Sequence, residues 1–184
     1  MRRAYGVAIG GRTGAGKDHL FRIMHAIEPR YHLISIGRII AQYVVKHNLT
    51  DDGRCEKPRD TKMLQELGSS MSDKWARLAT IACKMARDEG HIPVFTSVRR
   101  ECDELAARSL GFPIVIITAD KETRLRRLMQ RDGLSLEGAA EIMDDPETEH
   151  TVDRVVADFT WRNDTGVNRM REFARLTAFL GEIL

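Results

Sequence analysis

A glycine-rich run between an apolar segment and a helix-periodic segment most restricts the folds open to this chain. The run covers residues 11–18 (GRTGAGKD), follows the apolar residues Ala4–Ile9 and opens the predicted helix Lys17–Ala26. Its glycines allow backbone turns that side chains would block, so successive N–H groups can point inward around a phosphate. The following helix adds the positive end of its dipole. This setting is that of a Walker A motif, or P-loop, and predicts nucleotide binding rather than an ordinary glycine-rich turn.

The residues expected to hold the nucleotide in this way are Gly11, Arg12, Thr13, Gly14, Ala15, Gly16, Lys17, Asp18 and His19. Lys17 is the expected catalytic cation, because a flexible ammonium at this position reaches the β- and γ-phosphates of ATP. Asp18 stands where a serine or threonine normally ligates Mg²⁺. A carboxylate is also a hard oxygen ligand, so Asp18 is the candidate metal ligand. The alternative is that Asp18 only complements the dipole at the helix N-terminus.

Apolar runs alternate with longer helix-periodic segments along the chain. The predicted strands are Ala4–Ile9, His32–Ile36, Ile92–Thr96, Pro113–Thr118 and Val155–Trp161. The predicted helices are Lys17–Ala26, Arg38–His47, Asp60–Asp88, Arg100–Leu110, Lys121–Arg131 and Asn168–Ile183. Such alternation predicts one three-layer α/β domain over residues 1–184, with a parallel sheet of about five strands flanked by helices. Residues 48–58 and 132–153 are expected to be insertions in it.

The charge balance limits the partners that this chain is built to bind. It has 184 residues, with 29 Lys and Arg against 27 Asp and Glu, a formal net charge of +2. That balance disfavours a protein that coats nucleic acid or an anionic membrane. We expect no nucleic-acid partner, no membrane span and no signal peptide. The three cysteines are odd in number and lack metal-ligand spacing, which favours reduced thiols and a cytoplasmic location.

Several segments carry a resemblance that extends over nearly the whole chain. They are the phosphate loop with Asp after Lys, residues 59–68 (RDTKMLQELG) followed by Trp75, residues 96–99 (TSVR), and residues 158–164 (DFTWRND). In this order they resemble the P-loop deoxynucleoside monophosphate kinases of phages and bacteria. The chain is also similar to animal-type phosphomevalonate kinases and, more loosely, to dephospho-coenzyme A kinases. The resemblance implies a nucleoside-monophosphate-kinase-like fold with an acceptor-binding region at about 38–90 and a lid at about 124–150.

Arginines on the predicted helix Lys121–Arg131 occupy the place of the lid arginines in these kinases. Arg127 and Arg131 are four residues apart and so share a helix face. Arginines that close on a transferring phosphoryl group stabilise charge spread over its oxygens. The resemblance therefore implies that Arg127 and Arg131 are catalytic, and the alternative is a solvated basic helix face.

The acceptor is expected to meet residues from two segments. Arg99 follows a predicted strand, and ligands of parallel sheets gather at the carboxyl ends of strands. Arg59 and Gln65 lie in the region that forms the acceptor-binding wall in the resemblance. We expect the two arginines to bind the acceptor phosphate and Gln65 to contact a base, with surface pairing and core packing as the alternatives. Asn163 is expected at the adenine of ATP, or as a cap of the last helix.

Two residues depart from the patterns of these families. Ser97 stands where the monophosphate kinases have an acid, and Arg38 stands where dephospho-coenzyme A kinases have one. Taken together, the phosphate loop and the resemblance favour Mg²⁺- and ATP-dependent transfer of a phosphoryl group to a small phosphorylated substrate. The favoured substrate is a deoxynucleoside monophosphate. Phosphomevalonate, dephospho-coenzyme A or a modified base hydroxyl are alternative acceptors. A non-catalytic nucleotide-binding protein and a homodimer also remain open.

Overall fold

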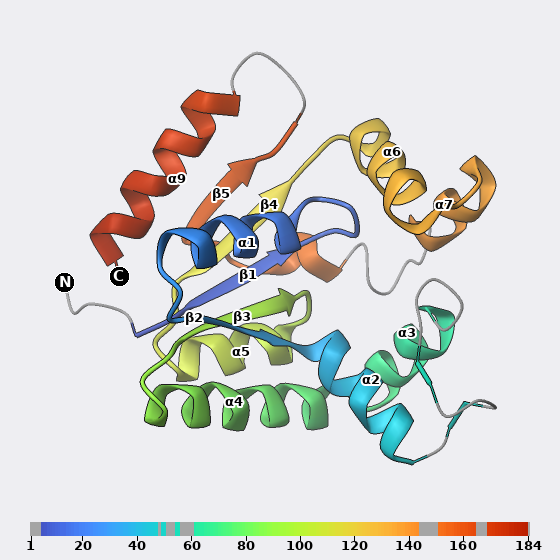
Figure 1. Cartoon of the computed structure of the whole chain (residues 1–184), viewed down its shortest axis with the longest axis horizontal. Helices are drawn as coiled ribbons and strands as arrows, with labels where there is room; N and C mark the ends of the chain where they lie inside the picture. Colours follow the sequence, from blue (N-terminus) through green and yellow to red (C-terminus); the bar gives the residue numbers. More distant parts are fainter. Residues whose placement is uncertain are drawn as a thin grey trace.

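Five parallel strands form the centre of the molecule, with helices on both faces (Figure 1). The computed structural model describes residues 5–47, 49–50, 54–55, 61–143, 151–164 and 169–183. The strands are β1 (Val7–Gly11), β2 (Tyr31–Ser35), β3 (Ile92–Val98), β4 (Ile114–Thr118) and β5 (Phe159–Arg162). They are ordered β2-β3-β1-β4-β5, and every neighbouring pair is parallel. The predicted fold class, a five-stranded parallel sheet flanked by helices, is confirmed.

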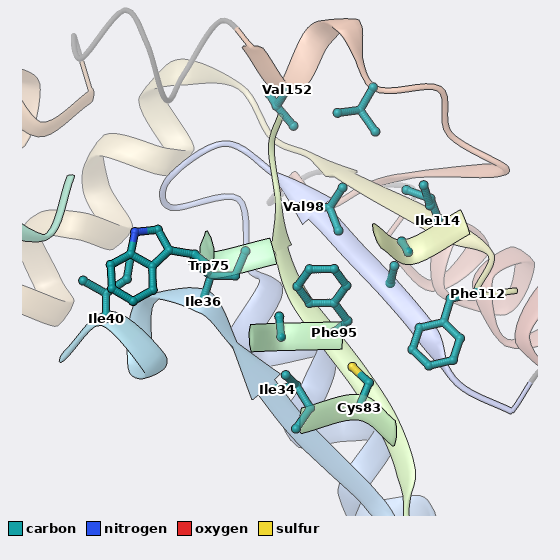
Figure 2. Close-up of a cluster of buried hydrophobic side chains, with 14 of the residues drawn as sticks. Ile34, Ile36, Ile40, Trp75, Cys83, Phe95, Val98, Phe112, Ile114 and Val152 are labelled. Carbon is teal, nitrogen blue, oxygen red and sulfur yellow. The ribbon is translucent and has the colours of Figure 1, made fainter. Parts of the chain in front are cut away.

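Alternate residues of the strands pack into two separate cores, as the pleat of a strand requires. On one face, Val7 and Ile9 of β1 join Leu20 of α1 (Lys17–Ile27) and Leu176 of α9 (Arg169–Ile183). On the other face, Ala8 joins the buried residues of α2 (Ile36–Lys46), α4 (Ser72–Asp88) and α5 (Glu101–Ser109). Figure 2 shows this second core around Phe95, with Trp75 against Ile36 and Ile40. The central strands are therefore covered on both faces and are almost wholly apolar.

The prediction of one continuous helix over Asp60–Asp88 is wrong, because two helices occupy this segment. The structure has α3 (Thr61–Ser70) and α4, and Met71 between them leaves the helical region with φ −132° and ψ 38°. The fully buried indole of Trp75 donates to the carbonyl of Leu67 at 2.7 Å, which fixes the corner. Periodicity cannot detect this break, because the apolar residues on either side keep helical spacing.

The insertion expected at 132–153 also contains structure. After α6 (Lys121–Asp132), Gly133 ends the helix with φ +65°, and α7 (Leu136–Met143) follows. Ala139 and Met143 of α7 pack against Leu128 of α6 in a small core of their own. A short 3₁₀ helix, Thr151–Arg154, leads towards β5. Residues 144–150, and most of the other expected insertion at 48–58, lie outside the described residues.

Two expected absences can be compared with the described part of the chain. None of its helices has the length and apolarity needed to cross a bilayer. No disulfide joins Cys55, Cys83 and Cys102 in that part of the chain.

Candidate active site

The phosphate loop (residues 11–18) joins the end of β1 to the start of α1 at the carboxyl edge of the sheet. Gly14 and Gly16 have φ values of +79° and +111°, which residues with a Cβ rarely adopt. A Cβ on Gly16 would also lie 2.2 Å from the side-chain nitrogen of Asn163. The ammonium of Lys17 donates to the carbonyls of Gly11 at 2.6 Å and Arg12 at 3.0 Å. The loop thus curls around the lysine that was predicted to bind phosphate.

A cavity of about 790 Å³ opens over the phosphate loop. Among the described residues that line it are eight Lys or Arg side chains and three Asp side chains, a local net charge of +5. Its walls come from the phosphate loop, α2, α3, α6 and the ends of β3 and β5. The carboxyl ends of the strands point towards these elements in Figure 1. A nearly neutral chain therefore concentrates positive charge at one site suited to a polyanion.

Predicted loop residues differ in what they contact. Thr13, Lys17, Asp18 and His19 line the cavity. The guanidinium of Arg12 instead pairs with Asp153, which follows the lid region in the chain. Both side chains are partly exposed, so this ion pair adds little stability.

Two arginines of α6 hold the backbone of the phosphate loop. Arg127 donates from Nη1 to the carbonyls of Ala15 at 3.2 Å and Gly14 at 3.4 Å, and from Nη2 to the Asn163 carbonyl at 2.7 Å. Arg124, which the sequence pattern did not single out for the site, donates from Nη1 to the Thr13 carbonyl at 3.3 Å. Arg127 lines the cavity, whereas Arg124 does not.

Arg131 lines the same cavity but has a different partner from Arg127. Its Nε and Nη2 donate to the two carboxylate oxygens of Asp132 at 2.7 and 2.6 Å. Asp132 and, at longer range, Asp18 raise the pKa of Arg131. The guanidinium is therefore fixed in its charged form at the cavity wall, with Asp18 close enough to affect it.

Asn163 is buried beneath the phosphate loop at the end of β5. Its side-chain nitrogen donates to the Ala15 carbonyl at 2.8 Å, and its side-chain oxygen has no hydrogen-bond partner among the described residues. The side chain is 1% exposed, yet the residue contributes to the cavity wall. Its clearest role in the structure is thus to fix the loop. Contact with an adenine stays a prediction.

The end of β3 carries a backbone irregularity next to the loop. The β1–β3 register pairs Ile9 with Thr96 but Gly10 with Val98, so Ser97 is the extra residue of a bulge. Ser97 has φ +83°, a positive value that residues with a Cβ rarely adopt, and it lines the cavity. Two residues later, Arg99 Nη2 donates to the hydroxyl of Thr13 at 3.2 Å. The structure therefore brings Arg99 to the phosphate loop.

Asp103 is a buried acid at this edge that sequence reasoning missed. Its Oδ2 accepts from the backbone N–H groups of Arg99 and Arg100, both at 3.1 Å. Burial raises the pKa of Asp103, although these two hydrogen bonds oppose the shift. An acid in the first turn of a predicted helix complements the helix dipole, and this signal could have identified Asp103.

Part of the cavity lining comes from α2 and α3. Gln65, Leu64 and Gly68 of α3 line the cavity, together with Arg38 of α2. Arg100 ties α3 to the start of α5 by donating to the Gly68 carbonyl and to the Ser69 hydroxyl, the latter at 3.0 Å. Gln65 thus lines the same cavity as Lys17, and its contact with an acceptor stays a prediction, whereas Arg59 lies outside the described residues.

The sequence comparisons give a relative over nearly the whole chain but no family. No protein-family model matches the chain. It is 27% identical over 181 residues to the UPF0200 protein TV0279 of Thermoplasma volcanium, covering 94% of this chain and 96% of that protein.

Solved structures of two kinases superimpose on nearly the whole chain. Shikimate kinase from Acinetobacter baumannii in complex with shikimate gives a TM-score of 0.60 at 15% identity, covering 97% of this chain and 94% of that one. Dephospho-CoA kinase from Campylobacter jejuni gives a TM-score of 0.57 at 16% identity, covering 98% and 100%. At these identities the likeness shows the fold, which is that of P-loop kinases.

Proposed function

We propose that this protein transfers the γ-phosphoryl group of ATP to a small phosphorylated acceptor. The observation that carries the proposal is the cavity over the phosphate loop, with a net charge of +5 among its described lining residues and with lining residues from α2 and α3 besides those of the loop. ATP and a phosphorylated acceptor are both anions, and the acceptor must attack the γ-phosphoryl group in line with the leaving oxygen. A single positively charged cavity that holds both substrates meets these two requirements. Both kinases named above have this fold, which supports the proposal.

The residues present fit a nucleoside triphosphate with Mg²⁺. The loop offers backbone N–H groups and the Lys17 ammonium, and the exposed Asp18 carboxylate lines the same cavity. The described residues contain no group of three or more His, Cys, Asp or Glu side chains able to hold a metal without the nucleotide. Asp18 would therefore hold the cation jointly with phosphate oxygens. When bound, Mg²⁺ neutralises charge on the β- and γ-phosphate oxygens.

The remaining roles follow from position. Lys17 stabilises negative charge on the transferred γ-phosphoryl group and on the oxygen that leaves with ADP. The guanidinium of Arg131 adds positive charge for the same phosphate oxygens. Arg127 reaches the phosphates only if it leaves the loop carbonyls, so in the described state it holds the loop. Positioning then contributes most of the rate, because phosphoryl transfer needs no nucleophilic side chain of the protein.

For the acceptor, we favour a deoxynucleoside monophosphate. The cavity lining from α2 and α3 combines cationic Arg38 with apolar Ile36, Ile40 and Leu64, and Arg99 lies beside the loop at Thr13. This set suits a phosphate attached to a flat apolar body. Gln65 supplies an amide that can both donate to and accept from a base. Arg59 is the further proposed ligand of the acceptor phosphate.

A non-catalytic nucleotide-binding protein is the second candidate, and Ser97 favours it. The acid expected there is absent, and the nearby carboxylate of Asp103 already accepts from two backbone N–H groups. One oxygen of the Asp103 carboxylate is thus already engaged by the backbone next to Arg99, and the side chain at position 97 is a hydroxyl instead of an acid.

A panel of acceptors with Mg²⁺ and ATP tests the proposal. ADP release is measured with the four common deoxynucleoside monophosphates, phosphomevalonate, dephospho-coenzyme A and a nucleoside with a modified base hydroxyl. We expect one deoxynucleoside monophosphate to give the highest kcat/KM. Turnover of another member alone would replace the acceptor. ATP binding without any phosphorylated product would favour the second candidate.

A further inference from the structure

Three consecutive carbonyl groups of the phosphate loop accept hydrogen bonds from side chains behind it. The Thr13 carbonyl accepts from Arg124, the Gly14 carbonyl from Arg127, and the Ala15 carbonyl from both Arg127 and Asn163. These donors come from α6 and from the end of β5, more than 100 residues further along the chain. We call Arg124, Arg127 and Asn163 the loop brace.

The brace affects phosphate binding through peptide geometry. In a trans peptide the C=O group and the following N–H group point in opposite directions. Carbonyls turned towards the brace therefore turn the N–H groups of Gly14, Ala15 and Gly16 away from it, towards the cavity side. The Ala15 N–H donates to the Arg12 carbonyl at 3.2 Å within the loop. Among the described residues, the Gly14 and Gly16 N–H groups have no backbone acceptor and can donate to a ligand.

Arg124 differs from the other members of the brace in its surroundings. It is 5% exposed and does not line the cavity, whereas Arg127 and Asn163 do. A Cβ on Gly14 would lie 2.8 Å from the Arg124 carbonyl, so the backbone of α6 itself lies close against the loop. Removing this buried donor takes one hydrogen bond away from the Thr13 carbonyl, which weakens the hold on that peptide of the loop.

We propose that Arg124 is a positioning residue that holds the phosphate loop in its phosphate-binding shape before any ligand arrives. It acts through the Thr13 carbonyl and adds a buried positive charge behind the loop. The inference deepens the proposed function, because it rests on the loop being the site for nucleotide phosphates. If the loop also samples other conformations, its apparent affinity for phosphate falls in proportion to the fraction of molecules in the phosphate-binding conformation.

The test compares Arg124→Gln and Arg124→Lys with Lys121→Gln, which removes an exposed charge from the same helix. Calorimetry measures the affinity for ADP with Mg²⁺, and hydrogen exchange measures protection of the loop amides without ligand. We expect Arg124→Gln to weaken ADP binding about tenfold or more and to speed exchange of the loop amides. Arg124→Lys should recover part of the affinity, and Lys121→Gln should bind as the wild type does.

Each outcome separates this inference from the proposed function. Folded Arg124→Gln with wild-type affinity and loop protection would overturn the positioning role. If that variant does not fold, Arg124→Lys decides, since affinity and protection equal to wild type would also overturn it. A Lys17→Ala variant that binds ADP as tightly as the wild type would overturn nucleotide binding at this loop. That result is independent of the results for the Arg124 variants.

Discussion

The side-chain nitrogen of Asn163 lies 2.8 Å from the carbonyl oxygen of Ala15, a hydrogen bond between the last strand and the first loop of the fold. This bond places the Asn163 amide directly against Gly16, where a Cβ would come within 2.2 Å of it. Gly16 is thus required both by its φ of +111° and by its neighbour.

Gly16→Ala should lower the free energy of unfolding by about 2–3 kcal/mol, because it adds a clash to an unfavourable φ. Gly133→Ala is the matched control, since Gly133 has φ +65° and a Cβ added there would meet no described atom within 4 Å. It should cost only about 1 kcal/mol. Urea denaturation measures both. Asn163→Ala combined with Gly16→Ala should recover part of the loss, and strict additivity would argue against the clash.

Ser97→Gly should raise the free energy of unfolding by about 1 kcal/mol, because glycine adopts the φ of +83° at this bulge without strain. Ser35→Gly is the control at the end of the neighbouring strand, where φ is −122°. That change should lower the free energy of unfolding by about 0.5–1 kcal/mol. Equal effects of the two substitutions in chemical denaturation would show that the bulge stores no strain.

Lys17→Ala should lower kcat/KM for ADP production by about 100-fold or more, to near abolition, because Lys17 is the cation held within the phosphate loop itself. The control is Lys84→Ala, at an exposed position of α4. Circular dichroism should show that both variants stay folded. Wild-type turnover by Lys17→Ala would contradict the catalytic assignment.

Asp103 should make stability fall as the pH rises above its ordinary pKa of 3.8, because burial raises the pKa of this carboxyl in the folded protein. The folded state then binds the proton more tightly than the unfolded state, so its advantage is present at low pH. It is lost as the pH rises through the folded pKa.

Asp103→Asn removes this titration and keeps an oxygen to accept from the backbone N–H groups. The wild type should therefore lose stability relative to Asp103→Asn as the pH rises through that window, in denaturation curves taken at successive pH values. Glu101→Gln, at an exposed position in the same helical turn, is the control. A pH-independent difference between wild type and Asp103→Asn would contradict the raised pKa.

The sequence by itself determined the parallel sheet and the phosphate loop. Both depend on local patterns, namely the alternation of apolar strands with helical periods and the spacing of glycines before Lys17. The helix break at Met71 and the helix Leu136–Met143 were not predicted, since each depends on packing against distant residues such as Leu67 with Trp75 or Leu128 with Ala139.

The tertiary structure alone decided which arginines serve the loop. By sequence, Arg127 and Arg131 were the expected pair on this basic helix, and Arg124 was not singled out. In the fold, Arg124 and Arg127 donate to loop carbonyls more than 100 residues away, whereas Arg131 pairs with adjacent Asp132. Helical spacing fixes the direction of a side chain relative to its own helix, but only the packing of α6 behind the phosphate loop determines which acceptors those side chains meet.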